Sequence, residues 1–404
     1  MASLAGVQGN SAESLPEGHF LFTSESVGEG HPDKLCDQIS DAILDACLKT
    51  DPDSKVNCTV SAKRNKFYIL GETSVKGYID IPEIVKDTVK NAGFDDKEKG
   101  LDYKDIEINL LIPEISQEEE VYYVPEDLKE EYIDIQGILF GYATAEWDDE
   151  TLLPLSHYLA SRICERLSEC RKNEILPWLR PDCKSQVTVE YKKEGNIISP
   201  VRVHNVLISS QHNPDIPIAI LREEIIENVI KEVIPEKYLD KDTTYYVNPS
   251  KSFTVGGPLV DSGSTGGKII VDTYGGWAPH GGGSFSGKDP SKIERSGAYY
   301  ARYVAKSLVK NKLCHRALVQ ISYTLGIPDP LAINIETFGT TKEGLNEEDI
   351  TWIVRKNFNF RLRSIMEELG LKEPIYRKTA VFGHFGRYDP EFRWEVPKED
   401  LILK

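Results

Sequence analysis

The 404-residue sequence is short of positive charge and of long hydrophobic stretches. It holds 48 Lys and Arg against 65 Asp and Glu, for a formal net charge of −17, so we expect no nucleic-acid partner. No apolar run approaches the roughly 20 residues that a spanning helix needs, so we expect no membrane partner. The first eighteen residues lack a basic start followed by an apolar stretch, and we therefore expect no signal peptide.

Cysteine is also scarce. The seven cysteines are scattered, and they are odd in number with no CxxC pair. A disulfide framework or a structural zinc site would need paired spacing. We therefore expect reduced thiols and a cytoplasmic protein.

Glycine, by contrast, is concentrated in one segment, residues 266–297. The apolar residues at 268–272 predict a strand that runs into a glycine-dense loop, and a helix is expected after the loop. Glycines let backbone N–H groups approach a ligand closely, and basic side chains add positive charge. The basic residues of this loop are Lys288, Lys292 and Arg295. In an acidic protein, this local patch indicates an anionic ligand such as a phosphate.

Two alternatives compete with a phosphate site in this loop. A flexible surface loop with solvated lysines is one, but Trp277 and Phe285 are unusual in such a loop. A P-loop is the other, because Gly282-x4-Gly287-Lys288 matches most of its pattern. However, Asp289 stands where a P-loop has Ser or Thr, and the predicted strand ends ten residues before the first glycine.

Hydrophobic periodicity divides the chain into three rounds of helices and strands. We predict helices at 33–48, 80–92, 153–170, 221–233, 296–310 and 347–357. We predict strands at 56–63, 67–72, 108–112, 186–191, 201–209, 268–272, 317–324 and 331–336, with 108–112 short and buried. The three rounds predict an α+β protein of three similar units, although no identical sequence repeats are visible.

Composition suggests where these units begin and end. Residues 1–18 are rich in Ser, Gly and Ala and are expected to be disordered, whereas 118–135 are crowded with Glu and predict a mobile acidic loop. The expected domains are an N-terminal one at 19–117, a central one at 136–254 and a C-terminal one at 255–397 that carries the phosphate-binding loop.

A second motif, GHPDK at residues 30–34, opens the first long helix. It places His31, Asp33 and Lys34 at a helix N-terminus, where the dipole and free N–H groups favour anions. Asp33 could hold Mg²⁺ between phosphates. The plainer alternative is that Asp33 only caps the helix.

Together the two motifs are far more specific than either alone. GHPDK near the N-terminus, with DTYGGWxxHGGGxFSGKD in the last third, resembles S-adenosylmethionine synthetase (methionine adenosyltransferase). Further segments resemble the same family, and the resemblance covers roughly residues 19–397. These segments are FTSESV at 22–27, GET at 71–73, FGYAT at 140–144, LPWLRPD at 176–182 and GHFGR at 383–387.

The resemblance implies a reaction and a fold. Members join L-methionine to ATP: the methionine sulfur attacks C5′ of the ribose, triphosphate leaves, and the same site hydrolyses it to phosphate and diphosphate. They have three interlocked α/β domains, each a mixed sheet covered by helices. They form homodimers or dimers of dimers with active sites at the interface, and they use Mg²⁺ and K⁺.

The resemblance also assigns roles by position. It implies catalytic roles for His31, Lys184, Lys288 and Lys292, ATP contacts for Ser250, Phe253, Asp261, Lys268 and Ser284, methionine contacts for Glu72 and Gln117, and Mg²⁺ binding for Glu25, Asp33 and Glu294. The barrier lies in charge that develops on the leaving triphosphate, which lysines and Mg²⁺ stabilise.

This sequence departs from the family at working positions. The family's GAGDQG is YIDIQG at 132–137, so Ile135 replaces an aspartate that contacts substrate, with Asp134 one place away. Thr59 replaces the glutamate that binds a monovalent cation, so we expect little dependence on K⁺. Ser252 and Gly267 replace arginines. A charge-assisted contact contributes about 1.5–3 kcal/mol, so losing two predicts a roughly 10²–10⁴-fold slower reaction, and arginine restored at 267 is expected to raise kcat.

Three hypotheses remain open from the sequence. The first is a working S-adenosylmethionine synthetase, favoured because His31, Asp33 and the phosphate lysines are retained. The second is a weakened or inactive paralogue that acts as a regulatory subunit. The third is a P-loop-type phosphotransferase, which would form ADP or a phosphorylated acceptor instead of S-adenosylmethionine.

Overall fold

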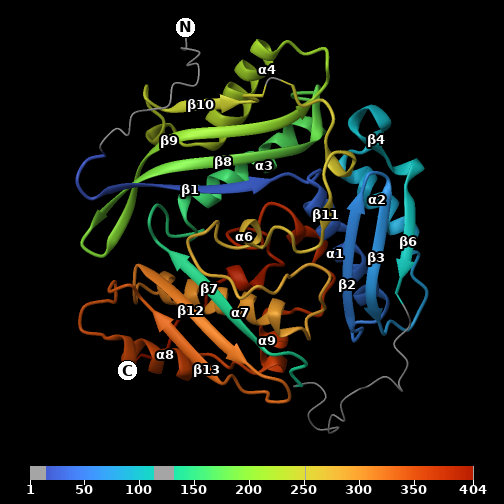
Figure 1. Cartoon of the computed structure of the whole chain (residues 1–404). Coiled ribbons are helices and arrows are strands. Elements are labelled where there is room, and N and C mark those ends of the chain that lie inside the picture. The colour runs from blue at the N-terminus through green and yellow to red at the C-terminus, as the bar shows by residue number, and fades with distance from the viewer. Residues whose placement is uncertain (1–14, 113–131, 251, 404) are drawn as a thin grey trace.

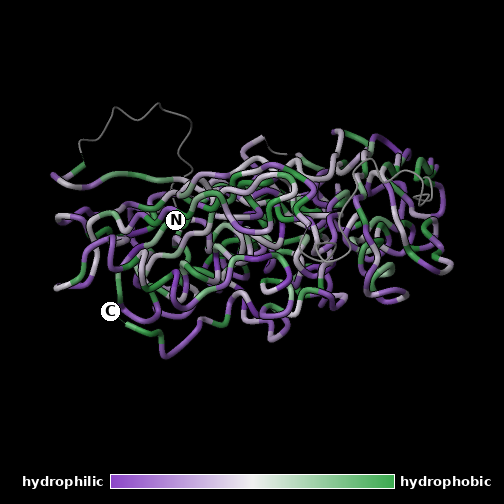
Figure 2. Tube along the Cα trace, turned by 90° about the horizontal axis from the view of Figure 1, so that it is seen from below, coloured by the Kyte–Doolittle hydropathy of each residue, from purple (hydrophilic) through white to green (hydrophobic). Residues whose placement is uncertain are grey.

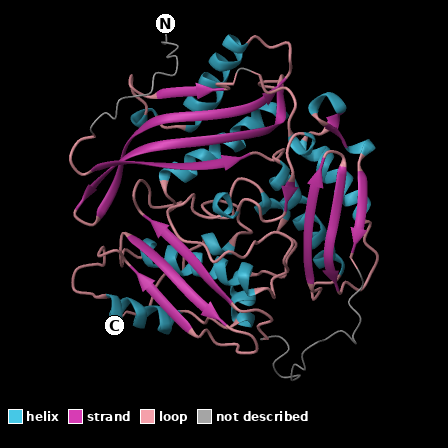
Figure 3. Ribbon diagram, viewed as in Figure 1, coloured by secondary structure: helices cyan, strands magenta, loops and turns pink. Residues whose placement is uncertain are grey.

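Three sheets lie around a central region of loops, and helices cover one side of each sheet (Figure 1 and Figure 3). This computed structural model describes residues 15–112, 132–250 and 252–403. The α+β class expected from the sequence, with three sheets covered by helices, is confirmed. Most of the expected acidic loop, and residues 1–14 of the expected disordered segment, lie outside the described residues.

The first sheet has the strand order β1-β8-β9-β10. Its strands are β1 (His19–Val27), β8 (Leu179–Glu194), β9 (Ile197–His212) and β10 (Thr244–Val247). β10 runs parallel to β9, and the other pairs are antiparallel. Helix α3 (Leu155–Lys172) packs against β8 and β1. A second helical segment consists of α4 (Ile218–Ile225), a π-helical turn (Ile226–Ile230) and α5 (Lys231–Val233).

The second sheet has the order β11-β2-β3-β6 and packs against α1. Its strands are β11 (Gly263–Ser264), β2 (Val56–Lys63), β3 (Lys66–Thr73) and β6 (Glu107–Leu111). Helix α1 (Pro32–Thr50) packs against β2 and against α2 (Ile81–Ala92). β4 (Asp95–Asp96) and β5 (Leu101–Asp102) form a small separate ladder.

The third sheet has the order β13-β12-β7, and β12 is antiparallel to both neighbours. Its strands are β7 (Gly137–Thr144), β12 (Arg316–Tyr323) and β13 (Ala332–Glu336). Helix α7 (Ile293–Lys310) packs against β7 and β12, and α8 (Glu347–Asn357) packs against β13. Helix α9 (Leu362–Leu369) packs against α7.

The three units share strands and helices that are far apart in the sequence. β1, at the start of the chain, pairs along its whole length with β8, and β11 joins the sheet of β2. Helix α1 is buried along most of its length because it also packs on β11 and on the turn Arg377–Ala380. The units are therefore interlocked rather than strung along the chain.

One strand prediction was right in position but wrong in burial. The segment expected as a short buried strand at 108–112 forms β6, yet Leu110 and Leu111 are 44 and 59 % exposed. β6 pairs with β3 alone at the edge of its sheet, so its side chains are covered less than those of a central strand.

Hydrophobic and hydrophilic residues alternate at short intervals along the coloured part of the trace (Figure 2). In keeping with this pattern, none of the helices in the described part of the chain is long and apolar enough to cross a membrane.

Candidate functional site

The glycine-dense loop leads from the middle of the molecule into α7, and β2 holds it in place. We call residues 281–292 the phosphate loop. The Cys58 N–H donates to the Gly287 carbonyl at 2.9 Å, and the Asp289 N–H donates to the Val56 carbonyl at 3.0 Å. Phe285 is buried at 3 % exposure. These contacts argue against the alternative of a flexible surface loop.

Glycine is required at one point of this loop. Gly287 has φ +81°, and a Cβ there would lie 1.9 Å from the Cys58 carbonyl oxygen. No other residue type allows the loop and β2 to come so close. The close approach fixes the backbone of the next residue, Lys288, against Asn57 in an isolated bridge.

The strand expected at 268–272 is wrong, because this segment forms the short helix α6 (Ile269–Asp272). The Asp272 N–H donates to the Lys268 carbonyl at 3.0 Å. β-branched residues favour strands only where a neighbouring strand is in reach, and α6 lies among loops in the middle of the molecule (Figure 1). A strand does not lead into the phosphate loop, so the context of a P-loop is missing as well.

His31 caps the N-terminus of α1 and is a neutral imidazole. Its Nδ1 accepts a hydrogen bond from the Asp33 N–H at 3.2 Å, and the residue is 2 % exposed. Burial, together with the positive charges of Lys268 and Lys184, lowers the pKa of His31 to about 3. Because Nδ1 is the acceptor, the single ring proton is on Nε2, which can donate to a ligand.

Asp33 holds the first of three lysines at the site. Its Oδ2 accepts from Lys268 Nζ at 2.6 Å, and its Oδ1 accepts from the Ser264 N–H at 2.9 Å. Burial opposes ionisation of Asp33, but these two hydrogen bonds outweigh it and lower the pKa. The carboxylate therefore faces the segment that carries Lys268 and does more than cap the helix.

The other two lysines flank the turn that precedes α7. Lys288 forms an ion pair with Glu294, and Lys292 forms one with Asp134. Burial lowers the pKa of Lys292, but Asp134 outweighs this effect and the pKa is raised, with smaller contributions from Asp289 and Glu72. Both lysines keep part of their surface open, at 17 and 16 % exposure.

Other residues assigned by resemblance face the same region. Lys184 and Asp261 are close enough to His31 to shift its pKa in opposite directions, and a Cβ at Gly266 would lie 2.3 Å from Ser284. Phe253 is held by His212, whose Nε2 accepts from the Phe253 N–H at 3.1 Å.

Some assigned residues are not brought together. Glu25 is exposed on β1 and accepts from Gln186 at 3.4 Å, without a contact to Asp33 or Glu294. Ser250 is exposed before the break at residue 251. Gln117 lies outside the described residues.

The carboxylates suit a Mg²⁺ ion that is shared with phosphates rather than one enclosed by protein. Within the described ranges, no group of three or more His, Cys, Asp and Glu side chains could hold a metal ion. Mg²⁺ is commonly bound by one or two carboxylates together with substrate phosphates. Asp33 and Glu294, each paired with a lysine, would supply two such carboxylates, whereas Glu25 has no contact with either of them.

Sequence reasoning missed a role for Asp182. It is 6 % exposed, and its Oδ2 accepts from the Gly257 N–H at 2.8 Å. Burial raises its pKa to about 6. A Cβ at Gly256 would lie within about 3 Å of both Asp182 and Phe253, so the two side chains meet across this glycine. Asp182 is the last residue of the LPWLRPD segment, and the resemblance of that segment to the family was the feature of the sequence that could have pointed to it.

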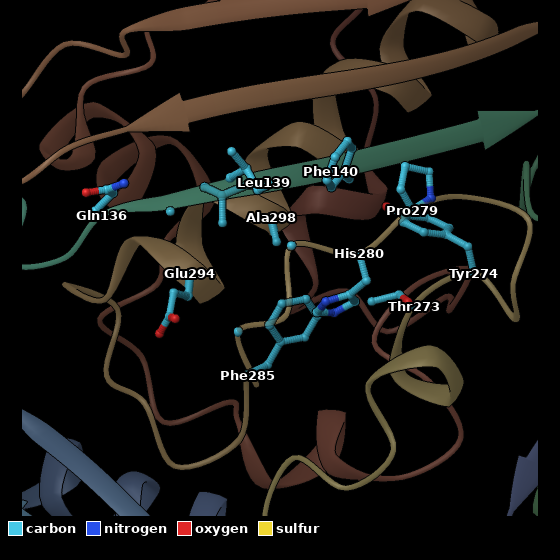
Figure 4. Close-up of a pocket in the computed structure, with 14 residues that line it drawn as sticks. Gln136, Leu139, Phe140, Thr273, Tyr274, Pro279, His280, Phe285, Glu294 and Ala298 are labelled. Atoms are coloured by element: carbon cyan, nitrogen blue, oxygen red, sulfur yellow. The ribbon is translucent and has the colours of Figure 1, made fainter.

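A small cavity of about 70 Å³ adjoins the phosphate loop (Figure 4). Leu139 and Phe140 of β7 form one wall, Phe285 of the loop and His280 just before the loop form another, and Glu294 stands at its edge. The cavity extends the site from the lysines toward the start of β7.

Family models match nearly the whole chain. The S-adenosylmethionine synthetase N-terminal domain matches residues 19–117, the central domain matches 133–253, and the C-terminal domain matches 255–396. The three matched spans follow one another along the chain in the order N-terminal, central and C-terminal domain.

Proposed function

The chain belongs to the S-adenosylmethionine synthetase family, and we propose that it forms S-adenosylmethionine from L-methionine and ATP. The observation that carries the proposal is a set of three lysines around the phosphate loop, each paired with one carboxylate: Lys268 with Asp33, Lys288 with Glu294 and Lys292 with Asp134. Lys288 and Lys292 lie in the loop that β2 fixes in place, and Lys268 follows Gly266 and Gly267, of which Gly266 packs against Ser284 of this loop. Such groups can bind a polyphosphate without reorganising.

The proposed mechanism needs no general base. Sulfur is already nucleophilic, so the chain has to orient it toward C5′ and stabilise the triphosphate as it leaves. Lys288 and Lys292 meet the charge that grows on the phosphates, and His31 donates its Nε2 proton as a hydrogen bond to the oxygen that leaves C5′. Because burial keeps His31 neutral, its catalytic role does not depend on protonation near neutral pH.

Asp33 and Glu294 would hold Mg²⁺ beside the phosphates. When bound, this ion would neutralise negative charge on the phosphates. The same carboxylates pair with Lys268 and Lys288, so phosphate oxygens can replace them on the lysines.

A second function is favoured by particular residues. Ser252 and Gly267 remove two arginines from the triphosphate site, and Asp33 occupies the space beside Gly267, where a Cβ would lie 2.6 Å from its Cγ. A catalytically weakened paralogue that regulates an active subunit is the alternative. In that case ATP binds with Mg²⁺ but turnover is poor.

We further propose a homodimer or dimer of dimers in the cytoplasm. Exposed apolar residues lie on strands of all three sheets, which suits a partner subunit. They include Leu21, Tyr68, Leu70, Leu110, Leu111, Ile138 and Tyr246. All seven cysteines are unpaired, in keeping with a reducing compartment.

A product assay tests the function. The purified protein is incubated with L-methionine, ATP and Mg²⁺, and we expect S-adenosylmethionine, phosphate and diphosphate. ATP binding without S-adenosylmethionine would support the regulatory alternative, and ADP would support a phosphotransferase. Because Thr59 supplies no carboxylate, rates in K⁺ and in a large organic cation should be similar; many-fold activation by K⁺ would contradict this expectation.

A further inference from the structure

Residues 132–136, which lead into β7, alternate between the core and the site. Ile133 is fully buried, and Ile135 packs against the same hydrophobic core. The Ile133 carbonyl also accepts from the Gly326 N–H at 2.9 Å, which fixes the segment against the loop after β12. Asp134 lies between these two residues, and its side chain forms an ion pair with Lys292 instead of packing against the core.

The two carboxylate oxygens of Asp134 have different surroundings. Oδ2 accepts from Lys292 Nζ. Oδ1 is buried and has no hydrogen-bond partner among the residues that the structure describes. A buried carboxylate oxygen left without a donor is destabilising, so it marks a place where a ligand can supply one.

From this geometry we propose that Asp134 is a specificity-determining residue that accepts a hydrogen bond from the α-ammonium group of the amino-acid substrate. The proposal rests on the proposed function, because it concerns the same site. Asp134 thereby supplies the carboxylate that Ile135 cannot, from the neighbouring position in the chain.

A zwitterion fits this pair better than a plain anion or cation. Asp134 and Lys292 present a negative and a positive group side by side, and an α-amino acid carries the complementary pair. Phosphate oxygens can take the place of Asp134 on Lys292, but an ionised phosphate has no proton to donate to Asp134 Oδ1, whereas the α-ammonium group of an amino acid has one. Glu72 adds a second negative charge in the field of Lys292, on the side where the resemblance places methionine.

The test compares L-methionine with its deamino analogue, 4-(methylthio)butanoate, in the wild type and in Asp134→Asn. In the wild type we expect a clear preference for L-methionine. In Asp134→Asn we expect KM for L-methionine to rise about 10–100-fold, in line with the loss of one charge-assisted contact. KM for the analogue should hardly change. KM for ATP should stay within about threefold.

Two controls separate this effect from a structural one. Glu107→Gln removes a carboxylate from an exposed pair with Lys66 and should leave both substrates unaffected. Ile135→Asp places a carboxylate toward the core, so it should lower the melting temperature without restoring the preference in Asp134→Asn. Melting profiles establish that each variant is folded.

Opposite results would overturn the proposal. If Asp134 only restrains Lys292, then Asp134→Asn frees the lysine, and ATP affinity or kcat rises while the preference for L-methionine persists. If the wild type forms no S-adenosylmethionine, the proposed function fails. Calorimetry in the presence of a non-hydrolysable ATP analogue then measures whether Asp134→Asn weakens the binding of L-methionine. Equal binding of L-methionine and its deamino analogue by the wild type would refute the proposal independently of turnover.

Discussion

The start of α1, the segment around α6 and the start of α7 each carry charged residues in two different electrostatic environments. Asp33, Lys268 and Glu294 belong to the site, where each ion pair is partly open, with side-chain exposures from 14 to 25 %. Their neighbours in the chain form a buried network with exposures of 2 % or less. This network consists of Lys34, Asp37, Asp41, Asp272 and Arg295.

The two regions differ in how many partners each charge has. Arg295 donates to both Asp41 oxygens, at 2.7 and 2.9 Å, and also to Thr379 and two backbone carbonyls. Lys288, in contrast, contacts one carboxylate, Glu294. A charge with many buried partners cannot exchange them without loss of stability, whereas a charge with one partly exposed partner can give it up to a substrate. The buried network therefore supports the structure, and the site pairs remain available.

The largest expected effect comes from a substitution in the buried network. Arg295→Met leaves Asp41 buried without its cation, which should cost about 3–5 kcal/mol of unfolding free energy, measured by denaturant titration. Lys66→Met, in an exposed pair, is the control and should cause no measurable loss. Equal stabilities of the Arg295 and Lys66 variants would contradict the division between the two regions.

The second effect falls on activity alone. Lys288→Ala removes a preorganised cation from the leaving triphosphate, so kcat for S-adenosylmethionine should fall about 10²–10³-fold. Because its pair with Glu294 is partly exposed, the melting temperature should change little. A large loss of stability with kcat retained would show that Lys288 belongs with the buried network.

The third prediction reverses an expectation from the sequence. Gly267→Arg was expected to restore a lost cation and raise kcat. However, a Cβ at 267 would lie 2.6 Å from Asp33 Cγ and Oδ1, so Asp33 has to move away from Lys268. We expect kcat to fall about tenfold, as a small misplacement of a catalytic group commonly causes. Ser252→Arg, at an exposed position, is the comparison; a faster Gly267→Arg enzyme would show that Asp33 moves freely.

The smallest effect concerns pH and the buried network. Burial raises the pKa of Asp272 to about 7, and Lys34 only partly offsets this. Between roughly pH 4 and 7 the folded chain therefore binds more protons at this group than the unfolded chain, so its contribution to stability falls as pH rises and is constant above 7. Relative to the wild type, Asp272→Asn should become more stable from pH 5 to pH 8. If the difference in unfolding free energy between Asp272→Asn and the wild type were the same at pH 5 and pH 8, the raised pKa of Asp272 would be contradicted.

The sequence predicted the long helices and most of the longer strands because their apolar periodicity is local. Helix 347–357 was predicted with the observed bounds, and β2 was predicted as 56–63. Periodicity did not reveal β1, whose partner β8 lies far along the chain. It also misassigned α6, because Ile269, Ile270 and Val271 favour a strand that no neighbour completes there.

The site was predictable in composition but not in pairing. Motifs identified Lys268, Lys288 and Lys292, but the carboxylate beside each of them depends on tertiary packing. Asp134 illustrates this point. Whether Asp134 or Ile135 faces the site is decided by the burial of Ile133, which one cannot read from the order of the three residues.

The pairing of β1 with β8 has a consequence for synthesis of the chain. During translation, β1 emerges first but has no partner until residue 194 has left the ribosome, and β2 and β7 wait longer still for β11 and β12. Three edge strands are thus open while the rest of the protein is made, a state prone to aggregation. The family domains should therefore not fold as isolated fragments, and the nascent chain is a natural client for chaperones that shield strand edges.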